Sequence, residues 1–158
     1  FGSRPAPAGT QAILPHFWPL GAMLASLLRP RGVSRRLTRA ITDVTSKALF
    51  EELTSADGPP ALVFYTAAWC KPCRDVALHV KALGDRLEGR DLRVLRIDVE
   101  ELGALAGEQG VKAVPFFEFH RDGHVVERLA GHGPEAVTEA AQRHADVHAE
   151  RRKRQEKR

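Results

Sequence analysis

Apolar residues follow two different spacings along this chain, and the alternation between them predicts strands and helices. Residues 61–65 (Ala-Leu-Val-Phe-Tyr) form an unbroken apolar run, which is typical of a short buried strand. After residue 73, apolar side chains recur at helical spacing, at Val76, Val80, Leu83 and Leu87. The same reasoning predicts helices over 46–55 and 102–109 and from Pro134 onward, and strands over 92–99, 116–120 and 125–130. The predicted order is helix, strand, helix, strand, helix, strand, strand, helix.

The two cysteines of the chain, Cys70 and Cys73, lie where the apolar strand turns into the following helix. The first N–H groups of a helix have no intrahelical partner, and the helix dipole places about half a positive charge there. A thiolate at Cys70 is therefore stabilised, and Lys71 adds a positive charge beside it. Pro72 fits the first turn of a helix, where its missing N–H has no bond to make. This setting predicts a nucleophilic Cys70 that faces Cys73 one turn on.

A cysteine pair with this spacing is suited to thiol–disulfide exchange. In that reaction the Cys70 thiolate attacks a substrate disulfide, and Cys73 then attacks the mixed disulfide and releases the reduced substrate. The alternatives are a pair of inert buried thiols, a structural disulfide or half of a zinc site. Zinc normally takes four nitrogen or sulfur ligands, and no second Cys-X-X-Cys motif follows, so we expect no metal.

The motif and several features downstream of it resemble the thioredoxin family. Residues 110–115 (Gly-Val-Lys-Ala-Val-Pro) are similar to the loop that ends in the cis-proline of that family, and Gly131 matches a family glycine beside the site. The residues that look like its Trp-Cys-X-Pro-Cys site are Trp69, Cys70, Pro72 and Cys73. The resemblance implies an α/β thioredoxin fold, with a central mixed sheet of about four strands flanked by helices. Helices on both faces would explain the unbroken apolar run.

The resemblance also implies what the other site residues do. Pro115, in its cis form, would lie against the disulfide and guide the substrate backbone, and Trp69 would offer protein partners a hydrophobic contact. The residues expected to contact substrate are Trp69, Lys71, Pro72, Val114, Pro115 and Gly131. The redox-active Cys70–Cys73 disulfide would serve in place of any cofactor. Disulfide-containing proteins would be the substrates, and a dithiol donor or reductase would recharge the pair.

Three positions depart from the family pattern. Phe64 stands where thioredoxins commonly have a buried aspartate that helps to move the proton of the second cysteine. An apolar ring accepts no proton, so resolution by Cys73 would depend on water or another group and turnover would be slower. Leu78 replaces a kinking proline, so its helix should run straighter, and Phe116 makes the substrate groove more apolar. These departures favour a specialised or partly vestigial thioredoxin-like protein.

Charge is distributed unevenly over the 158 residues. The chain is 43% hydrophobic and 28% charged, which suits one globular domain with extensions. Its formal net charge is +4, but residues 1–42 hold six arginines and no acid, and residues 151–158 hold six basic residues and one acid. The remaining residues, 43–150, therefore carry −7. We predict a basic and apolar extension over 1–42, a thioredoxin-like domain over 43–148 and a basic tail over 149–158.

The two ends of the chain suggest location and partners. Residues 1–42 resemble an organellar transit peptide, which predicts a mitochondrial location, with a plastid or the bacterial cytoplasm as alternatives. Residues 12–28 are uncharged apart from His16, and three interpretations stay open: an arm packed on a partner, a targeting or flexible segment, and membrane insertion. The basic tail is most simply the solvated continuation of the last helix. Its lack of aromatic residues argues against nucleic acid binding.

Two classes of function follow from these features. The first is a protein thiol–disulfide oxidoreductase of the thioredoxin type, acting through Cys70 and Cys73. The second is a thioredoxin-like accessory subunit of a mitochondrial or other organellar membrane assembly, such as a respiratory complex or ribosome. Such a subunit would be held through residues 1–42, and its redox activity could be retained or vestigial. A glutaredoxin-type enzyme is disfavoured, because its motif resembles Cys-Pro-Tyr-Cys.

Overall fold

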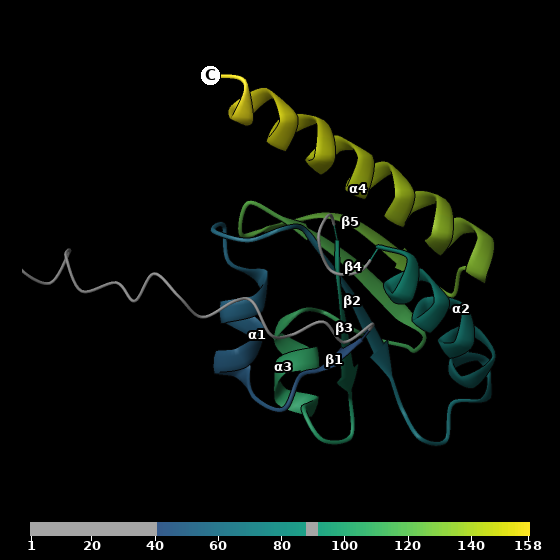
Figure 1. Cartoon of the computed structure of the whole chain (residues 1–158). Coiled ribbons are helices and arrows are strands. Elements are labelled where there is room, and N and C mark those ends of the chain that lie inside the picture. Colours follow the sequence, from purple (N-terminus) through teal and green to yellow (C-terminus); the bar gives the residue numbers. More distant parts are fainter. Residues whose placement is uncertain (1–40, 88–91) are drawn as a thin grey trace, which may run out of the picture. The chain divides into compact units, whose positions relative to one another are not determined.

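The computed structural model describes residues 41–87 and 92–158, which form a five-stranded mixed sheet with helices on both faces (Figure 1). In chain order the elements are β1 (Thr42–Asp43), α1 (Lys47–Thr54), β2 (Ala61–Thr66), α2 (Lys71–Leu87), β3 (Arg93–Asp98), α3 (Gly103–Glu108), β4 (Phe116–Arg121), β5 (His124–Ala130) and α4 (Pro134–Glu156). Each helix and strand predicted from the apolar spacing is present, with ends that differ by one or two residues.

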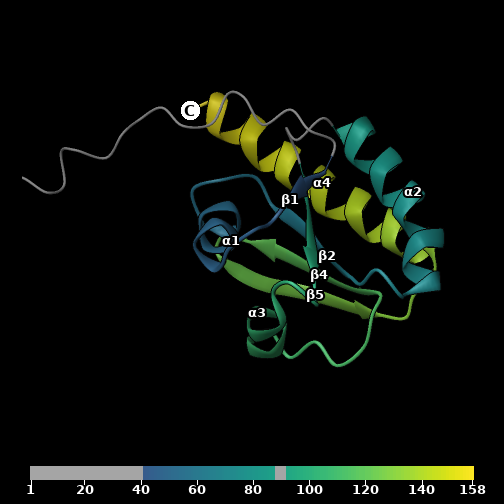
Figure 2. The same ribbon diagram turned by 90° about the horizontal axis from the view of Figure 1, so that it is seen from below.

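The strands lie in the order β1-β3-β2-β4-β5. Strands β1, β3 and β2 are parallel, whereas β4 and β5 each run antiparallel to their neighbours. Strand β2 is central and has helices on both faces, which Figure 2 shows from below, and this explains its unbroken apolar run. The mixed sheet flanked by helices is as expected, with one strand more than the four or so predicted. The additional strand is β1, whose two residues are too few to reveal a spacing; Thr42 pairs with Leu95 and Asp43 with Arg96.

Side chains of β2 alternate between two apolar clusters, one on each face of the sheet. Leu62 and Phe64 belong to the cluster beneath α2 and α4, which also contains both cysteines. Val63 and Tyr65 belong to the cluster beneath α1 and α3. The face covered by α2 therefore carries the redox motif, and the strand residues that project from this face determine what surrounds the cysteines.

A fully buried carboxylate, Glu118 of β4, joins three strands. The Tyr65 hydroxyl donates to Glu118 Oε2 at 2.8 Å, Arg128 Nε donates to Oε1 at 2.8 Å, and His120 Nε2 lies 3.3 Å from Oε2. Burial alone would raise the pKa of Glu118, but the hydrogen bonds from His120, Arg128 and Tyr65 hold this pKa below its ordinary value. Burial, reinforced by the neighbouring Glu118, raises the pKa of Tyr65 far above its usual range. Glu118 thus connects β2, β4 and β5 as an anion.

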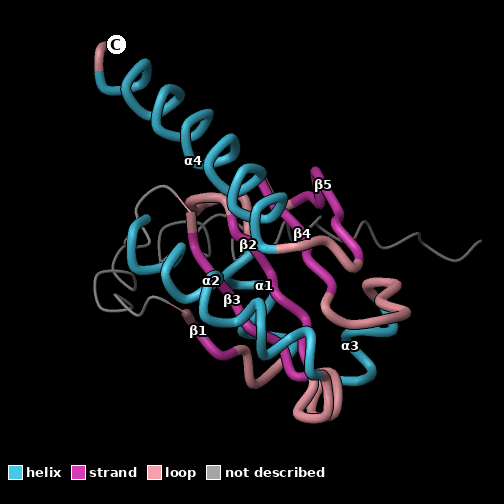
Figure 3. Tube along the Cα trace, turned by 90° about the vertical axis from the view of Figure 1, so that its right-hand side faces the viewer, coloured by secondary structure: helices cyan, strands magenta, loops and turns pink. Residues whose placement is uncertain are grey.

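The last helix, α4, runs for 23 residues from Pro134 to Glu156. Proline suits this position because its φ is already helical and its missing N–H needs no partner. The buried residues of α4 all lie in its first half: Val137, Ala140, Ala141, His144 and Ala145. Its last turns extend past the sheet, as Figure 3 shows, and Arg151 Nη1 donates to Asp122 Oδ2 in the turn between β4 and β5 at 2.8 Å. The basic residues near the C-terminus thus continue this helix, as expected.

Candidate active site

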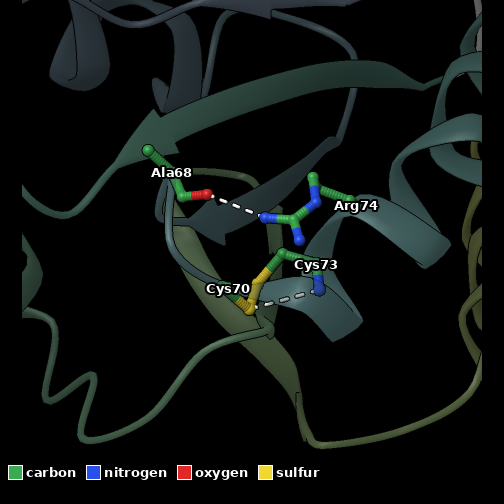
Figure 4. Close-up of a disulfide and its surroundings, with 4 residues drawn as sticks. All are labelled: Ala68, Cys70, Cys73 and Arg74. Atoms are coloured by element: carbon green, nitrogen blue, oxygen red, sulfur yellow. Dashed lines mark hydrogen bonds between the residues drawn. A yellow bond between two sulfur atoms is a disulfide. The ribbon is translucent and has the colours of Figure 1, made fainter.

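Cys70 and Cys73 form a disulfide at the start of α2 (Figure 4). Their Cα atoms are 5.3 Å apart, and the helix begins between them at Lys71. The backbone N–H of Cys73 donates to Cys70 Sγ at 3.2 Å. In the reduced protein the same N–H would stabilise a thiolate at Cys70, together with the helix dipole. The strand-to-helix setting predicted for the pair is confirmed.

Trp69 is highly exposed, whereas the cysteines that follow it in the motif are buried. The exposed fractions are 68% for Trp69, 2% for Cys70 and 1% for Cys73. An indole with so much exposed surface is available for contact with another molecule. The contact role of Trp69 agrees with this exposure and stays a prediction.

The loop before β4 is held at the redox motif by the pairing of β2 with β4. Phe116 lies opposite Tyr65 in that pair, so the residues before it come level with the end of β2. The peptide bond between Val114 and Pro115 is cis, as the resemblance implies. The Gly131 N–H donates to the Pro115 carbonyl at 3.2 Å, and Gly131 has a φ of 65°, a conformation that favours glycine. The structure therefore brings Pro115 and Gly131 together at the end of the sheet that carries the disulfide.

A cavity of about 270 Å³, here called the Trp69 groove, lies between Trp69 and α3. Of the residues predicted to contact substrate, Trp69 and Val114 line it. Three further lining residues, Val111, Lys112 and Ala113, belong to the 110–115 loop that carries the resemblance. The lining residues that the sequence did not point to are Val99, Gly103, Ala106 and Gly107. The groove offers a mainly apolar surface on which part of a substrate chain could lie.

Two basic side chains close to the cysteines have different partners. Lys71 Nζ lies 3.3 Å from Asp75 Oδ2 one turn on, and Lys71 and Pro72 are both exposed. Arg74, which the sequence did not point to, donates from Nη1 to the carbonyl oxygen of Ala68 at 3.0 Å (Figure 4). This bond ties the first turn of α2 to the loop before the cysteines. The carbonyl oxygen that accepts from Arg74 carries no net charge, so Arg74 and the helix start both contribute positive charge at the motif.

Phe64 occupies the place in which the resemblance implies a carboxylate in other family members. Its side chain is 1% exposed, and it packs in the same apolar cluster as both cysteines. The ring stacks on Phe117 of β4. Position 64 therefore contributes packing and no proton acceptor, as expected from the sequence.

Two further predictions concern metals and membranes. Among residues 41–87 and 92–158, no cluster of three or more histidine, cysteine, aspartate or glutamate side chains is placed to hold a metal ion. In the same part of the chain, no helix is long and apolar enough to cross a membrane. The predictions for residues 1–42, namely targeting, a partner-binding arm and membrane contact, fall on a segment whose first 40 residues lie outside the described part.

Known proteins similar to this chain are thioredoxins. The family model described as Thioredoxin matches residues 41–143. Thioredoxin Asp f 29 of Aspergillus fumigatus is 31% identical over 108 residues, which cover 68% of this chain and 98% of that protein. A solved mutant thioredoxin from Halobacterium salinarum is 27% identical, with a TM-score of 0.62, over 72% of this chain and 96% of its own. Mitochondrial thioredoxin 3 of Saccharomyces cerevisiae is 27% identical, with a TM-score of 0.60, over 65% of this chain and 94% of its own. With a matching sheet, a cis-proline loop and a disulfide-forming cysteine pair, the chain belongs to the thioredoxin family.

Proposed function

We propose that this protein is a thiol–disulfide oxidoreductase that reduces disulfide bonds in other proteins. The observation that carries the proposal is the Cys70–Cys73 disulfide at the start of α2, beside the cis-Pro115 loop. Membership of the thioredoxin family supports the same reaction class. The specialised or vestigial character suggested by Phe64 concerns the rate and stays a prediction.

In the proposed reaction the reduced cysteine pair supplies two electrons to the substrate. The Cys70 thiolate attacks one sulfur of the substrate disulfide, a bond forms between them, and the other substrate sulfur leaves as a thiolate. Cys73 then loses its proton and attacks Cys70 Sγ, which breaks the bond to the substrate and releases the second thiolate. The protein ends with the Cys70–Cys73 disulfide, and the substrate ends as a dithiol once its thiolates take up protons.

Substrate recognition is proposed at the Trp69 groove and the residues around it. Trp69 and Val114 offer apolar contact along the groove. The role of guiding the substrate backbone is proposed for Pro115, whose side chain is buried. Lys71, Pro72 and Gly131, which are exposed, complete the predicted contact set. A dithiol donor or a reductase would return electrons to the pair, and the proposed reaction uses no cofactor beyond the disulfide.

A mitochondrial location rests on the composition of residues 1–42 and has a parallel in the similar mitochondrial thioredoxin of yeast. It stays a prediction, with the plastid and the bacterial cytoplasm as alternatives. The alternative role as a subunit of an organellar membrane assembly finds no support in the family matches.

Reduction of insulin disulfides by the purified protein, with a small dithiol as electron donor, tests the proposed function. The protein should accelerate insulin precipitation, and Cys70→Ser should return the rate to background. Cys73→Ser should stop turnover but trap a mixed disulfide on Cys70, visible as a mass increase that a reductant reverses. Asp85→Asn, a charge change in an exposed ion pair on α2, is the matched control and should keep full activity. Activity that survives Cys70→Ser would overturn the assignment.

A further inference from the structure

A second cavity, of about 430 Å³, reaches Cys73 and shares no lining residue with the Trp69 groove. We call it the Cys73 cavity. Its charged lining residues are Asp43, Arg74, Arg96, Asp98 and Glu101. A cavity holds water when it has room for the molecule, about 30 Å³ in the liquid, and polar partners for it. The Cys73 cavity offers both, so it can hold water next to Cys73.

Cys73 must give up a proton before it can attack the mixed disulfide on Cys70. Its side chain is 1% exposed, and burial among apolar side chains favours the protonated form of a thiol. The ring of Phe64, which packs in the same cluster and lines the same cavity, cannot take that proton. The polar part of the Cys73 cavity, which Cys73 also lines, can supply an acceptor in its place.

Strand register places Asp98 on the face of the sheet that α2 covers, as it does Asp43, which pairs with Arg96. Phe64 of β2 pairs with Arg96 of β3, and Thr66 pairs with Asp98 two residues further along. Because side chains alternate along a strand, Thr66 and Asp98 project from the same face as Phe64. Asp98 is half-buried, and its Oδ1 accepts the backbone N–H of Glu100 at 2.9 Å, which holds the carboxylate in place.

The other charged groups around the cavity are less suited to accept this proton. The Asp43 carboxylate is bound by Arg96, with 2.5 Å between Oδ1 and Nε, so its charge is already balanced. Glu101 is exposed in the segment after β3. Arg74 and Arg96 are cations and accept no proton. Among the described residues that line the cavity, Asp98 combines a fixed position with partial burial.

We propose that Asp98 accepts the proton of Cys73 through water in the Cys73 cavity, and this inference rests on the proposed oxidoreductase function. The S–H bond of Cys73 breaks, and the proton passes over water to the Asp98 carboxylate and then to solvent. The electron pair left on sulfur forms the bond to Cys70 Sγ, and the substrate sulfur leaves as a thiolate. The mixed disulfide is the oxidant in this step, so no further reactant is needed. Asp98 thus accepts the proton that the ring of Phe64 cannot accept.

The attack by Cys70 and the resolution by Cys73 can be separated by rapid mixing. The reduced protein is mixed with an aryl disulfide that releases a coloured aryl thiolate in each step. The first release of colour reports attack by Cys70, and the second reports resolution by Cys73. Asp98→Asn should leave the first release unchanged and slow the second about a hundredfold near neutral pH, at the low end of what a proton acceptor contributes. The difference should disappear in alkaline solution, where the thiol ionises without help.

The direction of the change separates proton transfer from a simple charge effect. Removal of a negative charge near Cys73 would favour its thiolate, so an electrostatic role alone predicts a faster second release near neutral pH. Loss of a proton acceptor predicts a slower one. A second release that is unchanged or faster in Asp98→Asn overturns the inference.

Three variants test whether the effect depends on this carboxylate and on the cavity. Asp85→Asn makes the same change in an ion pair with Lys81, outside the cavity, and should leave both releases unchanged. Asp98→Glu keeps a carboxylate and should recover most of the rate. Ala77→Leu narrows the cavity without touching any carboxylate and should also slow the second release. If Ala77→Leu releases the second thiolate at the rate of the unmodified protein, the water path is wrong. If the unmodified protein releases no first thiolate, the proposed oxidoreductase function itself is wrong.

Discussion

Phe64 and Phe117 stack across β2 and β4, with ring centroids 5.1 Å apart and ring planes 12° apart. The two residues are direct partners in the antiparallel pairing of these strands. Their rings fill the core next to the cysteines, where the family commonly has a carboxylate. Position 64 therefore stabilises the fold, and proton transfer has to depend on other residues.

Phe64→Asp should lower the free energy of unfolding by about 3–5 kcal/mol, because it removes a buried ring and leaves a carboxylate among apolar side chains. Phe64→Leu, which keeps the position apolar, should cost less than about 1.5 kcal/mol. Denaturant unfolding of the two oxidised variants at neutral pH measures the difference. An aspartate variant as stable as the leucine variant would mean that position 64 is open to water.

Trp69→Ala should weaken the reaction with protein disulfides and leave stability almost unchanged, because the side chain is largely exposed. Loss of an aromatic contact of about 1.4 kcal/mol corresponds to a tenfold rise in KM for insulin. The rate with a small aryl disulfide should not change, and Trp69→Phe should retain most of the protein activity. If Trp69→Ala slowed the reactions with the small aryl disulfide and with insulin equally, Trp69 would act on the reactivity of the cysteines and not on protein binding.

Glu118 should make stability depend on pH in the acid range. Its folded pKa lies below the ordinary value of 4.5, so its contribution is fully present above about pH 4.5 and is lost as the pH falls through the folded value. Glu118→Gln should cost about 2–3 kcal/mol at pH 7, because Arg128 and Tyr65 lose their anionic partner. Unfolding curves from pH 7 to pH 3 should show this difference shrinking.

The matched control for this experiment is Glu108→Gln, which removes an exposed carboxylate paired with Lys47. Exposed pairs contribute little, so its unfolding curves should follow those of the unmodified protein. A difference between Glu118→Gln and the unmodified protein that stays constant with pH would argue against an anionic Glu118 in the folded state.

Gly131→Ala should destabilise the protein by about 1 kcal/mol, since a residue with a Cβ is strained at a φ of 65°. A Cβ at this position would meet no atom within 4 Å, so backbone strain is the only cost expected. Gly131→Asn, which tolerates this conformation better, should cost less. If Gly131 contacts substrate as predicted, both variants should lose insulin reduction to a similar degree despite their different stabilities.

The spacing of apolar residues predicted most of the fold, because the central strands are buried on both faces and each helix is buried on one face. The run over 61–65 located β2 for this reason. Strand β1 could not be found in the same way, because two residues have no period and their partners, Leu95 and Arg96, lie some fifty positions away. Its existence depends on tertiary pairing alone.

The candidate site was predictable where its residues are close in sequence and not where they meet only in space. Cys70 and Cys73 follow from their spacing and from the strand and helix around them. The Arg74 bond to the Ala68 carbonyl depends on a side-chain direction that the sequence does not encode locally. Asp98 is one of three acids within four positions, and only the register of β3 against β2 places it on the face covered by α2.

The ion pair between Arg151 and Asp122 places the basic last turns of α4 beside the turn between β4 and β5. The turn that holds Asp122 lies at the end of the sheet opposite the cysteines, because β4 runs antiparallel to β2. The basic end of α4 is therefore remote from the reactive sulfur atoms, although it contributes to the net charge of the chain. The net charge of the chain therefore does not predict whether a charged substrate is attracted to the disulfide or repelled from it. The ionic-strength dependence of the reaction will report the charges near the motif, whatever the sign of the whole molecule.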